Sequence, residues 1–249
     1  MAALLLRPLL NMVAIATPSG TERSCGSASM LAQQQQQQQR GEPLIDFGDP
    51  QTALEFMAVD DRIMGGSSTS RVVHDATEGA SCFQGNLIVE GGGFASVRYL
   101  KTFTLPTDCE ALSLTAAGDG RLGYKITLQS EGAAQGVSYQ YLLPLASDDD
   151  GNTASDLASG DGFTSMRIPL SAFKPSLRGR PAPDAPPLRA AEVRGLGLML
   201  SRYEVAGSGV KESIAPGPFR LRLRRLATAE SELAINGRRW VQAPAGNGA

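Results

Sequence analysis

The sequence predicts an all-β fold, an antiparallel sandwich or barrel that spans about residues 45 to 229. Short apolar runs alternate with turn residues along this stretch, and the 249-residue chain holds 28 glycines and 15 prolines. Several runs alternate apolar and polar residues with a period of two, as half-buried strands do. No long helical periodicity interrupts these runs before the C-terminal tail.

Eight apolar runs are expected to form strands, because turn residues bound each of them. They cover residues 82–90, 93–100, 111–118, 122–129, 138–145, 165–170, 193–200 and 219–226. In "YKITLQ", Tyr124, Ile126 and Leu128 should share one face of a strand, and the polar residues between them the other. The pair Asp119-Gly120 predicts a tight hairpin turn, which needs a positive φ.

Two low-complexity segments interrupt the strands. Residues 147–162 are acidic and rich in glycine and serine, and residues 178–192 are rich in proline. Such compositions favour loops over regular elements.

Residues 1–40 are predicted to lie outside the folded domain. They contain one acid, several serines and three arginines, a composition typical of an organelle transit peptide. A secretory signal is the second interpretation, but Arg7 and Pro8 interrupt the apolar run that it would require. The third interpretation is a tail with no targeting function. The glutamine tract at 33–39 is interpreted as a solvated spacer, and residues 230–249 as a C-terminal tail.

Overall composition excludes several classes of protein. The chain has 23 basic and 25 acidic residues, so it lacks the basic field typical of nucleic-acid binding. Cys25, Cys82 and Cys109 are odd in number and widely spaced, which indicates reduced thiols. No stretch approaches the roughly 20 apolar residues of a membrane-spanning helix. We therefore expect no transmembrane segment.

Motifs for catalysis are incomplete. "MGGSSTSR" lacks the lysine of a phosphate-binding loop, and neither "EGGGFASV" nor "RGLGLML" completes a dinucleotide fingerprint. There is no nucleophile elbow, and His74 is the only histidine. "DDDG" at 148–151 lacks the spacing of a calcium loop. No catalytic residue, metal site or cofactor is predicted, although Asp60, Asp61 and Asp119 could still meet in space.

A series of motifs occurs in a fixed order along the body of the chain. The series is "VDDRIMGGSSTSR", "FQGNL", "GGGFASVR", "GDGRLGYK", "RIPLSAFKPSLRGR", "VRGLGLML" and "GPFRLRLRRL". It resembles the complex I intermediate-associated protein 30 family over roughly residues 45–229, within a domain bounded at 43–229. The resemblance implies a galactose-binding-like β-sandwich, a jelly roll.

The same resemblance implies a function. Members act as non-catalytic assembly factors, or chaperones, that hold membrane-arm intermediates of mitochondrial respiratory complex I. Plastid relatives are associated with photosystem II biogenesis and with translation of one of its subunits. The chain departs from the family at Phe56, where members often have a tryptophan nearby, and in the arginines of its last strand. Both departures bear on the partner and leave the fold intact.

The segment "VDDRIMGGSSTSR" is interpreted as a turn at the rim of the sandwich. Gly65 and Gly66 should supply backbone angles or close approaches that a Cβ forbids, and Met64 should fill a gap in the core. Polar groups here are expected to bind Arg98 or turn amides. The segment is either a scaffold turn or a contact surface. Its candidate contact residues are Asp61, Arg62, Met64, Gly65, Gly66, Ser67, Gly93, Phe94, Arg98 and Asp119, with Phe94 expected to turn inward.

The last strand, "FRLRLRRL", predicts one apolar and one basic face. Arg220, Arg222 and Arg224 share the basic face, and the alternation breaks where Arg224 and Arg225 are consecutive. The basic face is either a solvated surface neutralised by acids or a docking strip for an acidic partner.

Three classes of function follow. The leading hypothesis is an organelle assembly factor whose partners are protein subunits or assembly intermediates of a membrane complex, in the mitochondrion or else the plastid. The second is a carbohydrate-binding module, by analogy of fold alone. Aromatic residues make up only 6% of the chain, and most lie inside strand runs. The third is an RNA-linked plastid factor, which only the arginine strip favours.

Overall fold

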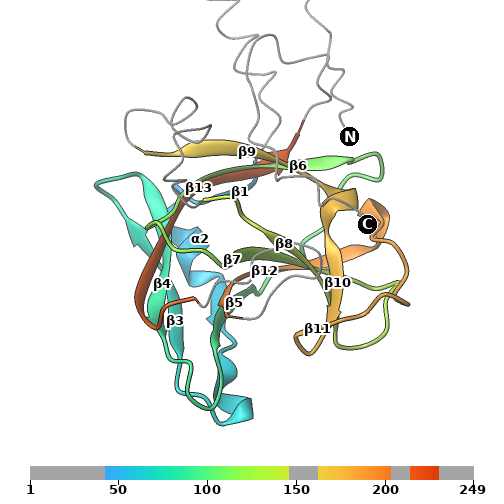
Figure 1. Ribbon diagram of the computed structural model, residues 1–249. Coiled ribbons are helices and arrows are strands. Elements are labelled where there is room, and N and C mark those ends of the chain that lie inside the picture. The colour runs from blue at the N-terminus through green and yellow to red at the C-terminus, as the bar shows by residue number, and fades with distance from the viewer. Residues whose placement is uncertain (1–42, 146–161, 203–213, 230–249) are drawn as a thin grey trace, which may run out of the picture. The chain divides into compact units, whose positions relative to one another are not determined.

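Two antiparallel β-sheets account for most of the described protein (Figure 1). The computed structural model describes residues 43–145, 162–202 and 214–229. The predicted transit peptide and glutamine tract, residues 147–161 of the acidic loop, and the C-terminal tail lie outside these ranges. In the described ranges, no helix has the length and apolar character needed to cross a bilayer.

Six strands form one sheet, which we call sheet A. They are β1 (Pro43–Asp46), β3 (Thr69–Asp75), β4 (Ala80–Leu87), β6 (Ala111–Ala117), β9 (Thr164–Pro169) and β13 (Gly217–Thr228). The order is β3-β4-β13-β6-β9, and β1 also pairs with β13. The long β13 therefore lies at the centre of the sheet, and β3 and β9 lie at its edges.

Seven strands form the second sheet, which we call sheet B. They are β2 (Phe56–Ala58), β5 (Phe94–Tyr99), β7 (Tyr124–Ser130), β8 (Val137–Leu142), β10 (Lys174–Leu177), β11 (Arg180–Pro181) and β12 (Val193–Ser201), in the order β11-β10-β8-β7-β12-β5-β2. Every strand pair in both sheets is antiparallel. The predicted antiparallel β-sandwich is confirmed.

A continuous apolar core fills the space between the inner faces of the two sheets. Tyr124, Ile126 and Leu128 of β7 all belong to it, as the period of two predicts. Two residues of the opposite face of β7, Lys125 and Thr127, are only 2% and 7% exposed. On this outer face Lys125 is flanked by its register partners Met199 of β12 and Leu142 of β8.

Each of the eight predicted runs contains a strand, but the connection at Asp119-Gly120 is not the predicted hairpin. Gly120 does adopt the expected positive φ, +82°. The strand before it, β6, belongs to sheet A, and the strand after it, β7, belongs to sheet B. The turn therefore passes the chain from one layer to the other, because the partners of both strands come from elsewhere in the sequence.

Several short elements have no counterpart in the sequence prediction. They are β1, β2, β10, β11, the helix α2 (Pro50–Leu54) and the 3-10 turns η1 (Asp61–Met64), η3 (Leu170–Ala172) and η4 (Ala190–Glu192). Two of them, β11 and η4, lie in the proline-rich segment where no element is expected. Elements of two to five residues are too short to show a periodicity.

Candidate functional site

Asp61 is the centre of a junction between the two sheets. Its carboxylate is fully buried and accepts four hydrogen bonds. The Ser68 N–H and hydroxyl donate at 3.0 and 2.9 Å, the Gly93 N–H at 2.7 Å and the Phe94 N–H at 3.3 Å. Ser68 precedes β3 of sheet A, Gly93 precedes β5 of sheet B, and Phe94 is the first residue of β5. One side chain thus fastens the two layers together.

Asp60 makes the same kind of connection one residue earlier. It accepts from the Ser70 hydroxyl at 2.6 Å and from the Ser70 N–H at 3.0 Å. It also accepts from the Ser96 N–H at 3.0 Å. Ser70 lies in the edge strand β3 and Ser96 in β5, so the carboxylate occupies donors that a neighbouring strand would otherwise pair. We call Asp60, Asp61 and their donors the carboxylate junction.

Glycines leave the room that the carboxylate junction needs. A Cβ on Gly66 would lie 2.2 Å from Asp61 Cγ, and one on Gly92 would lie 2.1 Å from its Oδ2. Gly65 has a φ of +87° and open space around its Cα. Both roles expected for these glycines, a special backbone angle and a close approach, are therefore present within one turn.

The donors around Asp61 govern its ionisation. Burial by itself raises the pKa of this carboxyl group, but the hydrogen bonds from Gly93, Ser68 and Phe94 outweigh that effect and lower the pKa below its ordinary value. Among the described residues no cation forms an ion pair with Asp60 or Asp61. Neutral amides and hydroxyls therefore hold both charges.

The expectation that Met64 fills a gap in the core is wrong, because its side chain is 61% exposed at the tip of η1. Of the two expected kinds of partner, Arg98 and turn amides, Asp61 has the amides: those of Ser68, Gly93 and Phe94 donate to it, and Arg98 is exposed on β5. Arg62 and Ser67 are exposed, and Phe94 is only half-buried rather than turned into the core. The exposed residues Arg62, Met64 and Ser67 remain available for contacts.

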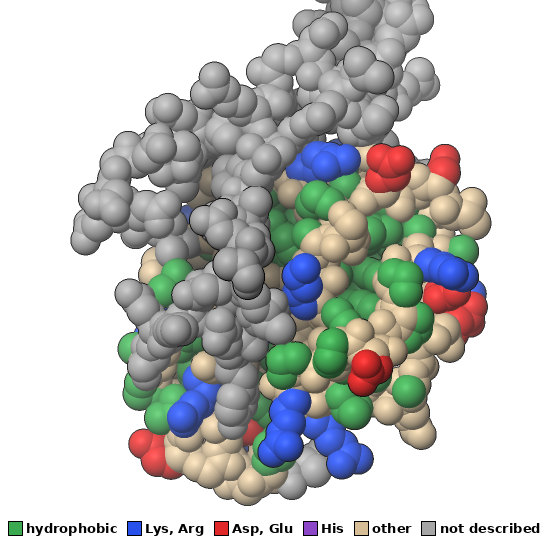
Figure 2. All heavy atoms as spheres, turned by 45° about the vertical axis from the view of Figure 1, so that its right-hand side comes forward, with side chains coloured by type: hydrophobic (Ala, Val, Ile, Leu, Met, Phe, Trp, Pro, Cys, Tyr) green, Lys and Arg blue, Asp and Glu red, His purple; other side chains and the backbone are tan. Residues whose placement is uncertain are grey.

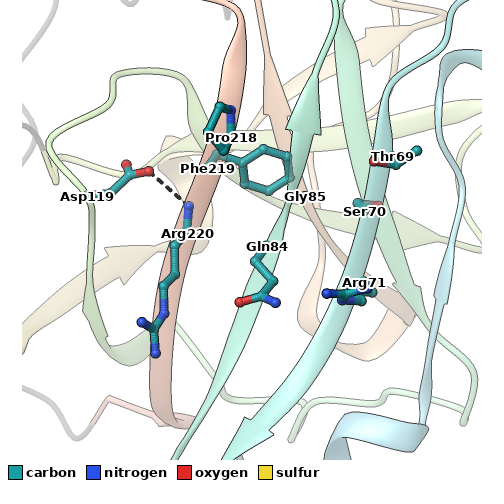
Figure 3. Close-up of a pocket in the computed structure, with 9 residues that line it drawn as sticks. All are labelled: Thr69, Ser70, Arg71, Gln84, Gly85, Asp119, Pro218, Phe219 and Arg220. Carbon is teal, nitrogen blue, oxygen red and sulfur yellow. Dashed lines mark hydrogen bonds between the residues drawn. The ribbon is translucent and has the colours of Figure 1, made fainter.

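A second group of candidate residues lines a cavity of about 500 Å³ on the outer face of sheet A (Figure 3). Strand pairing aligns Arg71 of β3, Gln84 of β4 and Arg220 of β13 in one row. Figure 3 shows the three side chains side by side, with Asp119 at the rim. Arg71 is exposed, and no acid among the described residues pairs with it. The row therefore places one guanidinium group on each side of the Gln84 amide.

Asp119 fixes the rim of this cavity. It accepts from the Arg220 N–H at 2.9 Å and from the buried Tyr124 hydroxyl at 3.0 Å. It also forms an ion pair with Arg121 at 3.5 Å. Burial raises the pKa of Tyr124, and the Asp119 charge raises it further, so the phenol stays a donor. The predicted residues Asp119 and Arg220 therefore meet at this cavity, which is also lined by Ser70, a donor to Asp60.

The arginines of β13 face outward as predicted, while Phe219, Leu221 and Leu223 are buried. The break after Leu223 is a shift of register against β6. Arg220 pairs with Asp75 and Arg222 with Glu78, both at 2.8 Å. The guanidinium carbons of Arg222 and Arg224 lie 4.9 and 3.8 Å from the ring centre of the buried Phe163. Acids of the β3–β4 turn neutralise the strip, as the solvated-surface interpretation expects.

Sequence reasoning missed the residues that complete both groups. Ser68, Ser70 and Ser96 hold the carboxylate junction, and Arg71 and Gln84 complete the cavity row. The serine-rich run after Gly66 was a usable signal, because serine hydroxyls readily bind nearby carboxylates. Nothing in the sequence distinguishes Gln84, since its role depends on the register of three strands.

Comparisons with known proteins bear on these groups. The family model "Complex I intermediate-associated protein 30 (CIA30)" matches residues 45–223, a span that includes the carboxylate junction and the cavity row. An uncharacterised protein of Schizosaccharomyces pombe, C9E9.15, is 28% identical over 190 residues, which are 69% of this chain and 80% of that protein.

Solved structures with a similar arrangement are carbohydrate-active proteins. A family 11 carbohydrate-binding module from Clostridium thermocellum, in complex with a β-1,3-1,4-mixed-linked tetrasaccharide, aligns with a TM-score of 0.44 and 14% identity. That match covers 74% of this chain and 95% of the module. The mannan-recognising module TmCBM27 aligns with a TM-score of 0.33 and 12% identity, over 74% of this chain and 95% of that one.

Proposed function

Because the chain belongs to the complex I intermediate-associated protein 30 family, we propose that it assists mitochondrial complex I assembly by holding partner subunits through protein–protein contacts, without catalysing a reaction. One observation supports this choice most directly. The two acids of its most distinctive segment, Asp60 and Asp61, are engaged by internal donors, with Asp61 fully buried and Asp60 half-buried. A carboxylate held in this way stabilises the fold by connecting the two sheets.

The proposed contact surface is the outer face of sheet A around the cavity row. Arg71 and Arg220 project from β3 and β13, the strands on either side of β4, and the sheet offers a broad surface to a partner. Arg222 and Arg224 are more fully engaged by Glu78 and Phe163. A partner with acidic side chains fits this row, and the charges would mainly set the orientation and rate of association.

A co-purification experiment tests the proposal. The tagged full-length chain is expressed in cells that lack the endogenous protein, and mitochondrial complexes are separated on native gels and identified by mass spectrometry. We expect the chain to migrate with a partial complex I and its loss to reduce the mature complex. The double variant Arg71→Gln/Arg220→Gln should capture less of this intermediate. Arg178→Gln/Arg180→Gln, on the opposite sheet, is the matched control.

Two results would contradict the proposal. Normal levels of mature complex I in cells without the protein would exclude an assembly role. Equal capture by the cavity-row variant and its control would move the contact surface elsewhere. In a plastid-bearing organism, a fusion of residues 1–40 to a fluorescent protein distinguishes import into mitochondria from import into plastids.

Aromatic placement weighs against the carbohydrate hypothesis. Sugar-binding surfaces use exposed aromatic rings for stacking, whereas every aromatic residue within the described ranges is buried or half-buried. The arginine face of β13 gives little support to nucleic-acid binding, because Asp75 and Glu78 pair with Arg220 and Arg222. On the face seen in Figure 2, from the side of β10 and β11, basic side chains are dispersed among hydrophobic ones.

A further inference from the structure

A second cavity, of about 680 Å³, lies at the opposite edge of sheet A from the cavity row. The end of the edge strand β9, the segment before β6, and η4 form its walls. Figure 1 shows β9 and β6 together at the top of the molecule, away from β3. This cavity shares no residue with the surface proposed for partner binding.

Arg167 of β9 is the unusual residue of this cavity. Its neighbours Met166 and Ile168 point into the core, so the alternation of the strand directs Arg167 outward. Its register partner on β6 is Ser113, which offers no charge. Arg167 Nε is buried without a hydrogen-bond partner, and no ion pair reaches this guanidinium among the described residues. By contrast, Arg220 and Arg222 on the same sheet have acidic partners.

Nε itself is covered by protein atoms, so a ligand in the open cavity reaches only the two outer nitrogens of this guanidinium, which have no partner among the described residues. These two nitrogens can hold a carboxylate with two parallel hydrogen bonds. Arg189 lines the same cavity and has only an exposed ion pair of 3.6 Å with Glu192. Pairs of that kind are weak, so Arg189 is a second available cation.

The remaining walls restrict the kind of anion. Pro169, Leu170, Leu188 and Ala190 give the cavity an apolar side. Glu110 also lines it and adds a negative charge that opposes a multiply charged ligand. A ligand with one negative charge and an apolar body satisfies both parts of the cavity, and the volume lies in the range of small-molecule sites.

We propose that this cavity binds a small monocarboxylate, whose carboxylate accepts hydrogen bonds from Arg167 and whose apolar body packs against Leu170 and Leu188. The proposal is independent of the assembly role. It concerns a different edge of the sheet and different residues.

Cys109 provides a direct readout, because it lines the same cavity. Burial raises the pKa of its thiol, so alkylation is followed at mildly alkaline pH. Anionic iodoacetate and neutral iodoacetamide are each reacted with the full-length chain, and modification of Cys109 is quantified by peptide mass spectrometry. We expect Arg167→Gln to lower the ratio of iodoacetate to iodoacetamide rates by roughly threefold or more, since the cation attracts the charged reagent. Arg71→Gln is the matched control and should leave the ratio unchanged.

Competition with unreactive compounds completes the test and does not depend on any variant. Benzoate should protect Cys109 of the unmodified chain in a saturable manner, and neutral benzamide of the same shape should not. Equal protection by the two compounds would overturn the proposal, as would an unchanged reagent ratio in a folded Arg167→Gln protein. If that variant fails to fold, the comparison of benzoate with benzamide decides alone.

Discussion

The carboxylate junction and the arginine face of β13 both use acidic side chains, but in opposite environments. At the junction, Asp61 is fully buried and meets only neutral donors. On the face of β13, Asp75 and Glu78 meet charged guanidinium groups at 2.8 Å, and the side chains of all partners remain 26–46% exposed. The buried carboxylate of Asp61 cannot exchange its hydrogen-bond donors, whereas the exposed acids and arginines on β13 can exchange theirs.

This difference separates scaffold from surface. A buried carboxylate that loses one donor leaves an uncompensated charge, so mutations there should be costly. Exposed ion pairs contribute little, because water and salt compete with both partners. We therefore expect Asp60 and Asp61 of the distinctive "DDRIMGGSS" segment to stabilise the sandwich, and the less distinctive arginine face to be better suited to binding.

The largest effect is expected from Gly92→Ala. Its new Cβ would lie 2.1 Å from Asp61 Oδ2, and the carboxylate cannot move without losing its donors. We expect the free energy of unfolding to fall by about 3 kcal/mol, as in overpacked cores. This change is measured by urea denaturation, with unfolding monitored by far-ultraviolet circular dichroism.

Gly65→Ala, in the turn that follows η1, is the matched control. Its backbone has a φ of +87°, but nothing lies within 4 Å of the added Cβ. The loss should be about 1 kcal/mol, from the left-handed backbone alone. Equal losses in the two variants would show that crowding at Asp61 is unimportant.

The next effect is that of Asp61→Asn, which preserves shape and removes charge. The amide group of asparagine must turn its NH2 toward either Ser68 N–H or the donors of Gly93 and Phe94, so two donors face each other. A loss of about 2 kcal/mol is expected from the unsatisfied groups. Asp184→Asn, at an exposed position, should leave the urea midpoint unchanged. A stable Asp61→Asn protein would contradict the role given to this carboxylate.

The eight strands that coincide with the apolar runs were predictable because their signals are local, whereas β1, β2, β3, β10 and β11 were not among those runs. Glycine and proline mark the ends of each run, and the period of two separates Tyr124 and Ile126 from the residues between them. The assignment of strands to sheets was not predictable in this way. The turn at Asp119-Gly120 has the chemistry of a hairpin, yet β6 and β7 belong to different sheets because their partners lie far away in the sequence.

The candidate site shows the same limit. The need for Gly65 and Gly66 could be inferred from the residues themselves, and so could a polar partner for Asp61 among turn amides. The particular donor, Gly93, lies 32 positions further along the chain. Met64 was misplaced because a thioether suits a core, but the 3-10 turn η1 directs it to solvent. The row of Arg71, Gln84 and Arg220 arises only from register.

Acid should sharpen the contrast between the two regions. The pKa of Asp61 in the folded protein is lowered, so its contribution to stability is complete above the unfolded-state value of about 4 and is lost as pH falls through the folded-state pKa. We expect the urea midpoint of the unmodified protein to drop below about pH 4, and that of Asp61→Asn to drop less. Asp75, whose pKa is also lowered, is present in both proteins and cancels in the comparison. Parallel pH profiles would contradict the assignment.

The smallest effect on stability is expected from the triple variant Arg220→Gln/Arg222→Gln/Arg224→Gln. Glutamine keeps the aliphatic part of each side chain and removes the guanidinium groups, and with them the charges and the contacts of Arg222 and Arg224 with the Phe163 ring. Each exposed pair with Asp75 or Glu78 contributes less than about 1 kcal/mol, so the melting temperature should fall by only a few degrees. The difference from the unmodified protein should shrink further in 1 M salt, where such pairs are screened. The variants of the carboxylate junction should show no such salt dependence.

The triple variant should affect partner capture more than it affects stability. If the face of β13 contributes to binding, the folded triple variant should lose capture most at low ionic strength, where the native contact is strongest. If the variant unfolds instead, the arginines belong to the scaffold together with Asp61, and the contrast between the two regions disappears.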